Sequence, residues 1–191
     1  MNFNKFQQVL INSKKRQKAF TLVEVLIAIS ILTVGILSGF ILITKVLYNT
    51  AVIKDRLTAS FLAQEGIELV RQVRDSNFLQ IMNGESTELK WRDGLEIDGS
   101  YTIESKAESG GSVELNSVEP GEAPNFFYDS NTRIYNYNAT EEPTTFNREI
   151  KITTIGDDNN EIRVEAIMQW TTKRINFNLT VEDHLFNWIE F

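Results

Sequence analysis

Hydrophobic and polar residues change their spacing twice along the chain. Residues 20–44 form an unbroken apolar run, apart from the carboxylate of Glu24. Over residues 45–80 the apolar positions return every three to four residues, as on one face of a helix. Beyond the turn signal Asn83-Gly84, apolar and polar residues alternate. This pattern predicts one continuous N-terminal helix of roughly 60 residues, or ~90 Å, followed by β-strands.

The second half of the predicted helix is amphipathic. Its apolar face follows the spacing i, i+4, i+7, i+8 and i+11, at Leu62, Gly66, Leu69, Val70 and Val73. The opposite face carries the charged residues Glu65, Glu68, Arg71 and Asp75. No proline falls between residues 20 and 79, so nothing in this stretch forces the helix to end.

Alternating apolar residues predict strands within residues 85–191. The longest alternation has five members, Ile162, Val164, Ala166, Met168 and Trp170, and shorter ones lie at 95–103, 150–152 and 175–181. The breaks at 156–160 and 171–174 are short enough to join neighbouring strands as an antiparallel meander. Such a sheet must bury its apolar face, and the amphipathic half of the helix offers a matching surface. We therefore expect an α+β fold, with the long N-terminal helix packed on a C-terminal antiparallel β-sheet.

Residues 108–146 differ in composition from the rest of the predicted sheet domain. They contain all three prolines, Gly110-Gly111 and many Asn, Ser and Glu residues. Apolar segments at 126–128 and 134–137 flank the turn signal Asp129-Ser130-Asn131, which predicts an inserted hairpin. Its tyrosines either form a variable contact surface or cover the edge of the sheet. The aromatic ending, 185–191, is expected to dock on the sheet or the helix.

The charge is divided unevenly along the chain. Residues 1–19 hold five basic and no acidic residues, whereas the remainder holds 14 basic and 26 acidic residues, which leaves a net charge of −7. A basic segment before an apolar run stays on the cytoplasmic side of a membrane, so the domain that follows is expected outside. The acidic domain has no basic stripe, so nucleic acid is not an expected partner.

Three interpretations of the apolar run compete. A cleaved secretory signal has an apolar core of about 7–15 residues, but Val25 to Thr44 is 20 residues without a charge. A plain signal anchor fits this length. However, it leaves Glu24 unexplained, because an isolated carboxylate near hydrocarbon costs on the order of 2–3 kcal/mol. In the third interpretation the chain is cut between Ala19 and Phe20, and the new amine lies one helical turn from Glu24.

The segment Lys18–Ala28, KAFTLVEVLIA, resembles the prepilin-type signal of type IV pilins and type II secretion pseudopilins. This resemblance implies that a membrane peptidase cuts after Ala19, which stands where glycine is usual, and N-methylates Phe20. It also implies that Glu24 pairs with the amine of a neighbouring subunit during filament assembly. Residues 1–19 are then a leader, 20–44 a transmembrane and assembly helix, 45–80 its amphipathic continuation and 85–191 the extracytoplasmic domain.

Two further features bear on assembly. Residues 59–75 resemble a segment of minor pilins of the V type and pseudopilins of the I type, which favours a minor subunit. Gly35 and Gly39 form a Gly-x-x-x-Gly pair, which allows helices to approach closely or the helix to unwind locally in a filament. Glycine is also common in membrane helices without either role.

No group of residues predicts a catalytic, cofactor or metal site. Asp157 and Asp158 begin an oxygen-rich segment that suits calcium, but it lacks EF-hand spacing and lies where a hairpin turn is expected. His184 stands alone, and no acidic residue has a neighbouring base or nucleophile. The chain has no cysteine, which excludes disulfides and thiolate chemistry. We therefore expect a protein that is not an enzyme and needs no cofactor.

Together with the resemblance, these features predict a minor pilin or minor pseudopilin, a structural subunit of a type IV pilus or a type II secretion pseudopilus. Its expected partners are the prepilin peptidase/methyltransferase, major and other minor pilins or pseudopilins, the inner-membrane assembly platform and membrane lipid, with a role in DNA uptake left open. The N-terminus is expected in the cytoplasm and the C-terminal domain outside, first in the membrane and then in an extracytoplasmic filament. The alternative is a single-pass, signal-anchored binding domain that does not polymerise.

Overall fold

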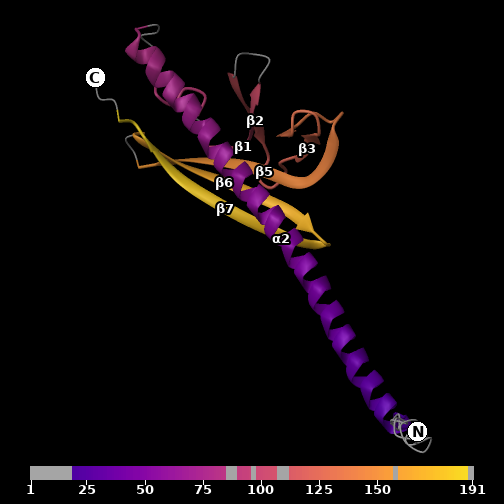
Figure 1. Cartoon of the computed structure of the whole chain (residues 1–191). Helices are drawn as coiled ribbons and strands as arrows, with labels where there is room; N and C mark the ends of the chain where they lie inside the picture. Colours follow the sequence, from indigo (N-terminus) through magenta and orange to yellow (C-terminus); the bar gives the residue numbers. More distant parts are fainter. Residues whose placement is uncertain (1–18, 85–89, 96–97, 107–111, 157–158, 189–191) are drawn as a thin grey trace, which may run out of the picture. The chain divides into compact units, whose positions relative to one another are not determined.

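The computed structural model describes residues 19–84, 90–95, 98–106, 112–156 and 159–188 (Figure 1). The long helix α2 runs over 61 residues from Leu22 to Met82. Within the described residues seven strands follow it: β1 (Gly99–Lys106), β2 (Ser112–Val118), β3 (Asn125–Asp129), β4 (Ile134–Asn136), β5 (Glu142–Ile155), β6 (Glu161–Thr172) and β7 (Ile175–Phe186). A long N-terminal helix and a C-terminal antiparallel sheet are therefore both present, which confirms the predicted α+β fold.

The chain divides into two compact units, residues 1–48 and residues 49–191. The described part of the first unit is helical from Leu22 onward, and it buries no side chain. The second unit holds the C-terminal part of α2 and the whole sheet, and all of the buried core lies in it.

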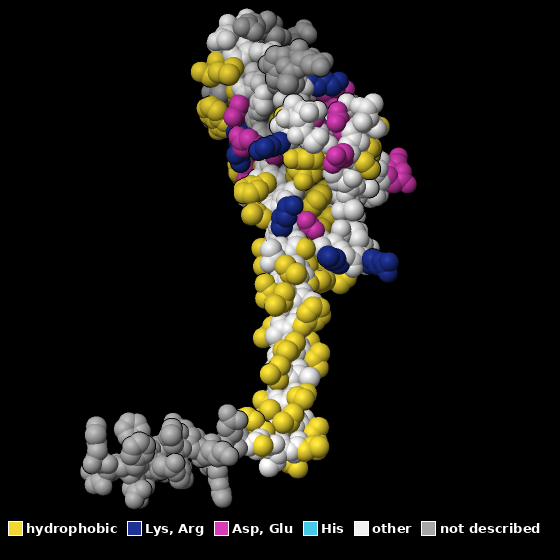
Figure 2. Space-filling model, turned by 45° about the vertical axis from the view of Figure 1, so that its right-hand side comes forward, with side chains coloured by type: hydrophobic (Ala, Val, Ile, Leu, Met, Phe, Trp, Pro, Cys, Tyr) yellow, Lys and Arg dark blue, Asp and Glu magenta, His cyan; other side chains and the backbone are white. Residues whose placement is uncertain are grey.

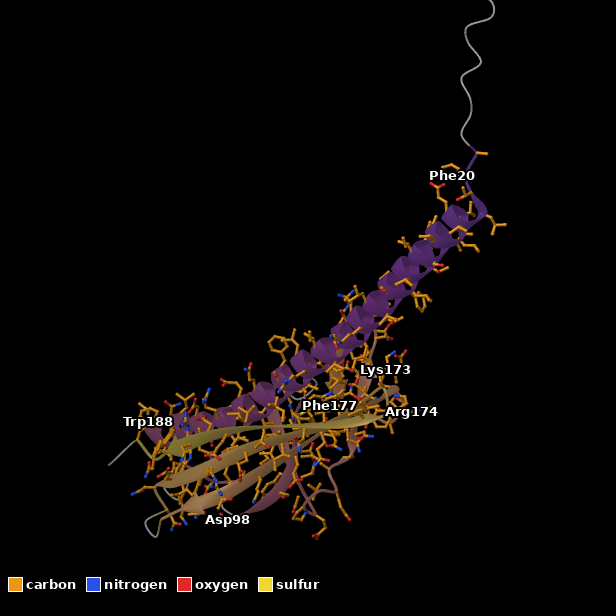
Figure 3. The ribbon with its side chains drawn as sticks, turned by 90° about the horizontal axis from the view of Figure 1, so that it is seen from below. Phe20, Asp98, Lys173, Arg174, Phe177 and Trp188 are labelled. Atoms are coloured by element: carbon orange, nitrogen blue, oxygen red, sulfur yellow. The ribbon has the colours of Figure 1, made fainter. Side chains whose placement is uncertain are left out.

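All strand pairs in the sheet are antiparallel, and β5 lies at its centre. One end of β5 pairs with β3, the other end pairs with β1, and its opposite edge pairs with β6 over Asn147–Ile155. The chain then turns back from β6 into β7, which pairs with β6 along its whole length. The two-residue turn, Lys173-Arg174, has positive φ at both residues (52° and 70°), as a type I′ hairpin turn requires (Figure 3).

The core lies between α2 and one face of the sheet. Figure 1 shows α2 crossing the strands β5, β6 and β7. On β6 every second residue is buried, at Ile162, Val164, Ala166, Met168, Trp170 and Thr172. The helix contributes a matching buried face, at Ala59, Leu62, Ala63, Gly66, Ile67, Leu69 and Val70. The two sequence periods, two in the strand and about 3.6 in the helix, therefore meet in a single core.

Gly66 is buried where α2 packs against side chains of β5. A Cβ atom there would lie 2.7 Å from Cδ1 of Ile150 and 2.9 Å from Cδ of Arg148. Real Cβ contacts are longer than this, so any larger residue here would force these two side chains to shift.

Arg148 of β5 is the largest fully buried side chain and lies among the core residues. Its Nη1 donates to the carbonyl oxygen of Leu62 on α2 at 2.6 Å, and its Nη2 donates to the carbonyl oxygen of Ile103 on β1 at 2.6 Å. The guanidinium also lies 5.0 Å from the ring centre of Phe126, and Nη1 is 3.1 Å from the half-exposed carboxylate of Glu65. One side chain thus holds a helix and two strands together.

The segment between β2 and β5 packs on the sheet through aromatic rings. Phe126 stacks on Tyr137 with ring centres 4.7 Å apart, and Tyr135 contacts Phe146 of β5 edge-to-face at 6.0 Å. Burial raises the pKa of Tyr137 to about 12. Tyr135 and Tyr137 therefore pack against the core. A variable contact surface on this hairpin stays a prediction.

Two other contacts close the domain. The buried carboxylate of Glu149, on the face of the sheet opposite α2, accepts bonds from the hydroxyl of Ser100 (2.5 Å) and the backbone N–H of Gly121 (2.8 Å). Near the C-terminus Leu185 is buried, and the ring of Trp188 lies 4.8 Å from that of Phe78 on α2 (Figure 3). The described part of the aromatic ending therefore docks on the helix as well as on the sheet.

Candidate assembly site at the start of the long helix

Thr21 begins the long helix as its N-cap. Its side-chain oxygen accepts a hydrogen bond from the backbone N–H of Glu24 at 3.2 Å, and its carbonyl accepts from Val25 at 3.2 Å. A hydroxyl three residues before a glutamate is the capping-box spacing. The helix therefore starts at Leu22 because of a local signal, T-x-x-E, that the apolar pattern conceals.

The predicted cleavage site lies just before this cap. Ala19 and Phe20 precede the helix and are exposed, and Figure 3 shows Phe20 where the ribbon of α2 begins. An exposed, non-helical peptide bond is the form of chain that a peptidase can bind. Phe20 lies outside the helix, two residues before its start, whereas Glu24 lies in its first turn.

Polar side chains within the apolar run are satisfied by the helix itself. Each of four hydroxyls donates to the carbonyl oxygen four residues earlier, over 2.8–3.2 Å: Ser30, Thr33, Ser38 and Thr44. Such bonds let hydroxyl groups enter hydrocarbon without leaving a donor unpaired.

The carboxylate of Glu24 is the exception. Within the described part of the chain its side chain makes no hydrogen bond and no ion pair. Its charge is favourably placed near the positive end of the helix dipole, but this is worth only about 0.3–1 kcal/mol at a surface. The carboxylate therefore still lacks a partner of opposite charge.

The apolar surface around Glu24 is also uncovered. Large apolar residues from Leu22 to Leu47 are between 44% and 76% exposed, and Figure 2 shows hydrophobic side chains over the visible face of this half of the helix. α2 contains a stretch long and apolar enough to cross a membrane, and none of that stretch is buried. Gly35 and Gly39 lie in this stretch, where α2 remains continuous and, apart from the adjoining helix backbone, no atom comes within 4 Å of a Cβ placed on either residue.

Comparison with known proteins identifies this region. A family model described as the prokaryotic N-terminal methylation motif matches residues 14–40. The chain carries the signal of type IV pilins and pseudopilins. No curated protein and no solved structure matches the chain.

The pilin signal has direct consequences for the residues just described. It implies processing by a prepilin peptidase and assembly with other pilins, and it points to a structural subunit rather than an enzyme. Together with the long apolar helix it supports membrane anchoring with an extracytoplasmic domain. The individual roles predicted for Ala19, Phe20, Glu24, Gly35 and Gly39 stay predictions.

The other candidates from the sequence lie elsewhere. Asp157 and Asp158 are outside the described residues, and among those that are described no group of three His, Asp or Glu side chains is placed to hold a metal ion. His184 is not isolated. Its Nδ1 lies 2.5 Å from Glu161 and its Nε2 lies 3.1 Å from Glu182, and these hydrogen bonds raise the pKa of the imidazole.

Proposed function

We propose that this chain is a minor pilin or minor pseudopilin that enters its filament by pairing Glu24 with the amine of a neighbouring subunit. The observation that carries the proposal is the contrast within the apolar run. Four hydroxyls there are satisfied internally, whereas the carboxylate of Glu24 has no partner in the described chain.

Cleavage after Ala19 would create the missing cation. The α-amine of Phe20 would lie directly before the N-cap, where the helix dipole is positive and disfavours a second positive charge. The carboxylate of an adjacent subunit relieves that repulsion, and the amine in turn neutralises Glu24. Both groups therefore gain more from a neighbouring chain than from remaining alone in the membrane.

The apolar surface would serve two environments in turn. In the membrane, lipid covers the exposed side chains between Leu22 and Leu47. In a filament the same residues would pack against the helices of other subunits, with Gly35 and Gly39 allowing close approach or local unwinding. The inner-membrane assembly platform would supply the work of extraction. The assignment to the minor class is supported by the resemblance of residues 59–75 to V-type pilins and I-type pseudopilins.

Substitution of Glu24 tests the pairing. Glu24→Gln keeps the size and removes the charge, and we expect it to be cleaved and retained in the membrane but depleted from filaments. A loss of about 2 kcal/mol corresponds to roughly thirtyfold less incorporation. The measurement is immunoblotting of sheared filaments against the membrane fraction. Glu68→Gln, an exposed substitution on the same helix, is the matched control. Equal incorporation of the Glu24 and Glu68 variants would remove the pairing from the proposal.

Analysis of the N-terminus separates the proposal from its alternative. Mass spectrometry of the membrane-extracted protein should find N-methylated Phe20 as the first residue, and Ala19→Leu should retain the 19-residue leader. An intact Met1 in the wild-type protein would instead support a single-pass, signal-anchored binding domain that does not polymerise.

A further inference from the structure

A groove of about 630 Å³ lies on the sheet at the end nearest the β6–β7 turn. Its volume falls within the range of about 300–1,000 Å³ that is usual for sites binding small molecules. Among the residues that the structure describes, its lining includes seven Asn, Gln and Thr side chains and no charged one. This is unusual in a chain of which 24% of the residues are charged.

The polar side chains of the groove stand on the face of the sheet opposite α2. On β6 the buried residues Met168, Trp170 and Thr172 face the core, so the residues between them, Gln169 and Thr171, face away from it. The strand register extends this outward surface onto both neighbouring strands.

The first row of the groove consists of three amides. Asn147 of β5 pairs directly with Gln169 of β6, which pairs directly with Asn178 of β7. Directly paired residues have Cβ atoms about 4.5–5.5 Å apart, so the three amides form an evenly spaced line across three rigid strands. Gln169 and Asn178 are exposed, and neither side chain makes a hydrogen bond to another described residue.

Thr145, Thr171 and Asn176 form a second row beside the first, and these residues are hydrogen-bonded to one another. Thr171 donates to the side-chain oxygen of Asn176 at 2.8 Å, and Thr145 donates to the carbonyl of Thr171 at 3.1 Å. At the side of the groove, the amide of Asn147 reaches Asn125 of β3 at 3.5 Å. These bonds fix the surroundings of the first row and leave its amides with unused donors and acceptors.

We propose that this groove binds an uncharged carbohydrate chain. Each sugar hydroxyl both donates and accepts hydrogen bonds, and each amide offers the same two capacities side by side. A charged ligand would find no counter-charge among the lining side chains. The groove is on a face of the sheet, so a peptide there could not extend the sheet through its backbone, as it would at an edge strand.

The pilin signal makes such a ligand accessible, because an extracytoplasmic domain meets the glycans of the cell envelope and of surrounding surfaces. The proposal goes beyond incorporation into a filament. A protein that never polymerises could still bind glycan through this groove, and a filament subunit could assemble without it.

Saturation-transfer NMR on the full-length protein tests the proposal. The protein is held in micelles of a detergent without a sugar headgroup, and the probes are maltohexaose, cellohexaose and chitohexaose, with a galacturonate hexamer as the charged comparison. We expect saturation transfer to at least one neutral hexasaccharide. Replacing both Gln169 and Asn178 with alanine should weaken its binding about tenfold, as the loss of two hydrogen bonds predicts.

The matched control is Thr180→Ala, which removes an exposed polar side chain from the same face of β7 outside the groove. It should leave binding unchanged, and unchanged thermal unfolding of all variants shows that the sheet is intact. The absence of transfer to all three neutral probes would overturn the proposal. Equal binding of the neutral hexasaccharide by the double variant and the wild type would overturn it too. A third contrary result is tighter binding of the galacturonate hexamer that 0.5 M salt abolishes. The cations of the adjacent Lys173-Arg174 turn would then be the binding groups.

Discussion

Replacing Arg148 with methionine should destabilise the domain, although arginine is the costlier residue to bury. Methionine keeps most of the side-chain length and its contact with the ring of Phe126, and it removes both hydrogen bonds to carbonyl groups. The substitution therefore isolates the contribution of the donors from that of packing.

The two carbonyls respond differently to the loss. Leu62 lies within α2, where its carbonyl keeps the backbone N–H four residues later as a donor. The carbonyl of Ile103 has no second donor on the β5 side, because β1 pairs with β5 only from Gly99 to Tyr101. A buried carbonyl without a partner costs about 1–3 kcal/mol, and the charged donor of the second bond is also lost. The ion pair with Glu65 adds little, since that carboxylate is half exposed. We expect a net loss of about 2–3 kcal/mol.

Urea unfolding of the full-length protein, followed by tryptophan fluorescence, measures this loss. All three tryptophans (Trp91, Trp170 and Trp188) lie in the sheet-containing unit. With a slope near 2 kcal/mol per molar urea, the midpoint should fall by about 1–1.5 M. Arg163→Met, on the outward face of β6, is the control and should cost less than about 1 kcal/mol. If Arg148→Met were as stable as the wild type, the desolvation free energy of the buried guanidinium would equal the stabilisation from its hydrogen bonds, and the reasoning would be refuted.

Three other predictions follow from local geometry. Gly66→Ala should lower the unfolding free energy by about 1–2 kcal/mol, because its new methyl group would lie 2.7 Å from a core side chain, whereas Gly35→Ala, with no atom within 4 Å, should leave the unfolding midpoint unchanged. His184 has a raised pKa in the folded protein, so its protonated form stabilises the fold. This stabilisation should be complete below pH ~6.5, the pKa of an unfolded histidine, and should disappear as the pH rises through the pKa of His184 in the folded protein. As the only histidine, it can be titrated by NMR without assignment, and a midpoint at or below 6.5 would contradict this. Replacing Lys173-Arg174 with Asn-Gly should raise the unfolding free energy by about 1 kcal/mol, because both positions have positive φ, and an unchanged melting temperature would count against strain in this turn.

The sequence predicted the fold class because two regular periods dominate it. The helical face containing Leu62, Gly66 and Val70 and the alternation of β6 are both long enough to be read directly. It did not reveal that β5 is a strand of 14 residues, since Pro143 and Arg148 interrupt its apolar alternation. A buried arginine is indistinguishable in sequence from an exposed one, because its carbonyl partners on other elements carry no side-chain signature.

Strands at the margin of the sheet were also hidden. β2 has no fully buried residue and pairs only with β1 among the described strands. Its positions therefore accept polar as well as apolar residues, and no long apolar alternation marks the strand. This is why the sequence did not predict a strand at residues 112–118. In the groove, likewise, Gln169 and Asn178 are separated in the chain by the β6–β7 turn, and only the strand register places them side by side.

The candidate assembly site could be located from the sequence but not completed. The positions of Phe20 and Glu24 followed from the apolar run and the signal before it. The T-x-x-E spacing does signal the N-cap at Thr21, but it lies inside the hydrophobic run, where the apolar pattern alone sets no helix start. The partner proposed for Glu24 belongs to another subunit, so no single chain can display it.

Because α2 supplies about a third of the buried core of the sheet domain, that domain is not an interchangeable module. A chain that began after Met82 would leave the buried faces of β5 and β6 open to water, whatever its own sequence. Homologous recombination between subunits of this kind would yield folded hybrids when the crossover falls before Ala59, the first fully buried residue of the helix. The membrane segment can thus be inherited separately from the sheet, whereas residues 59–82 must be inherited with it.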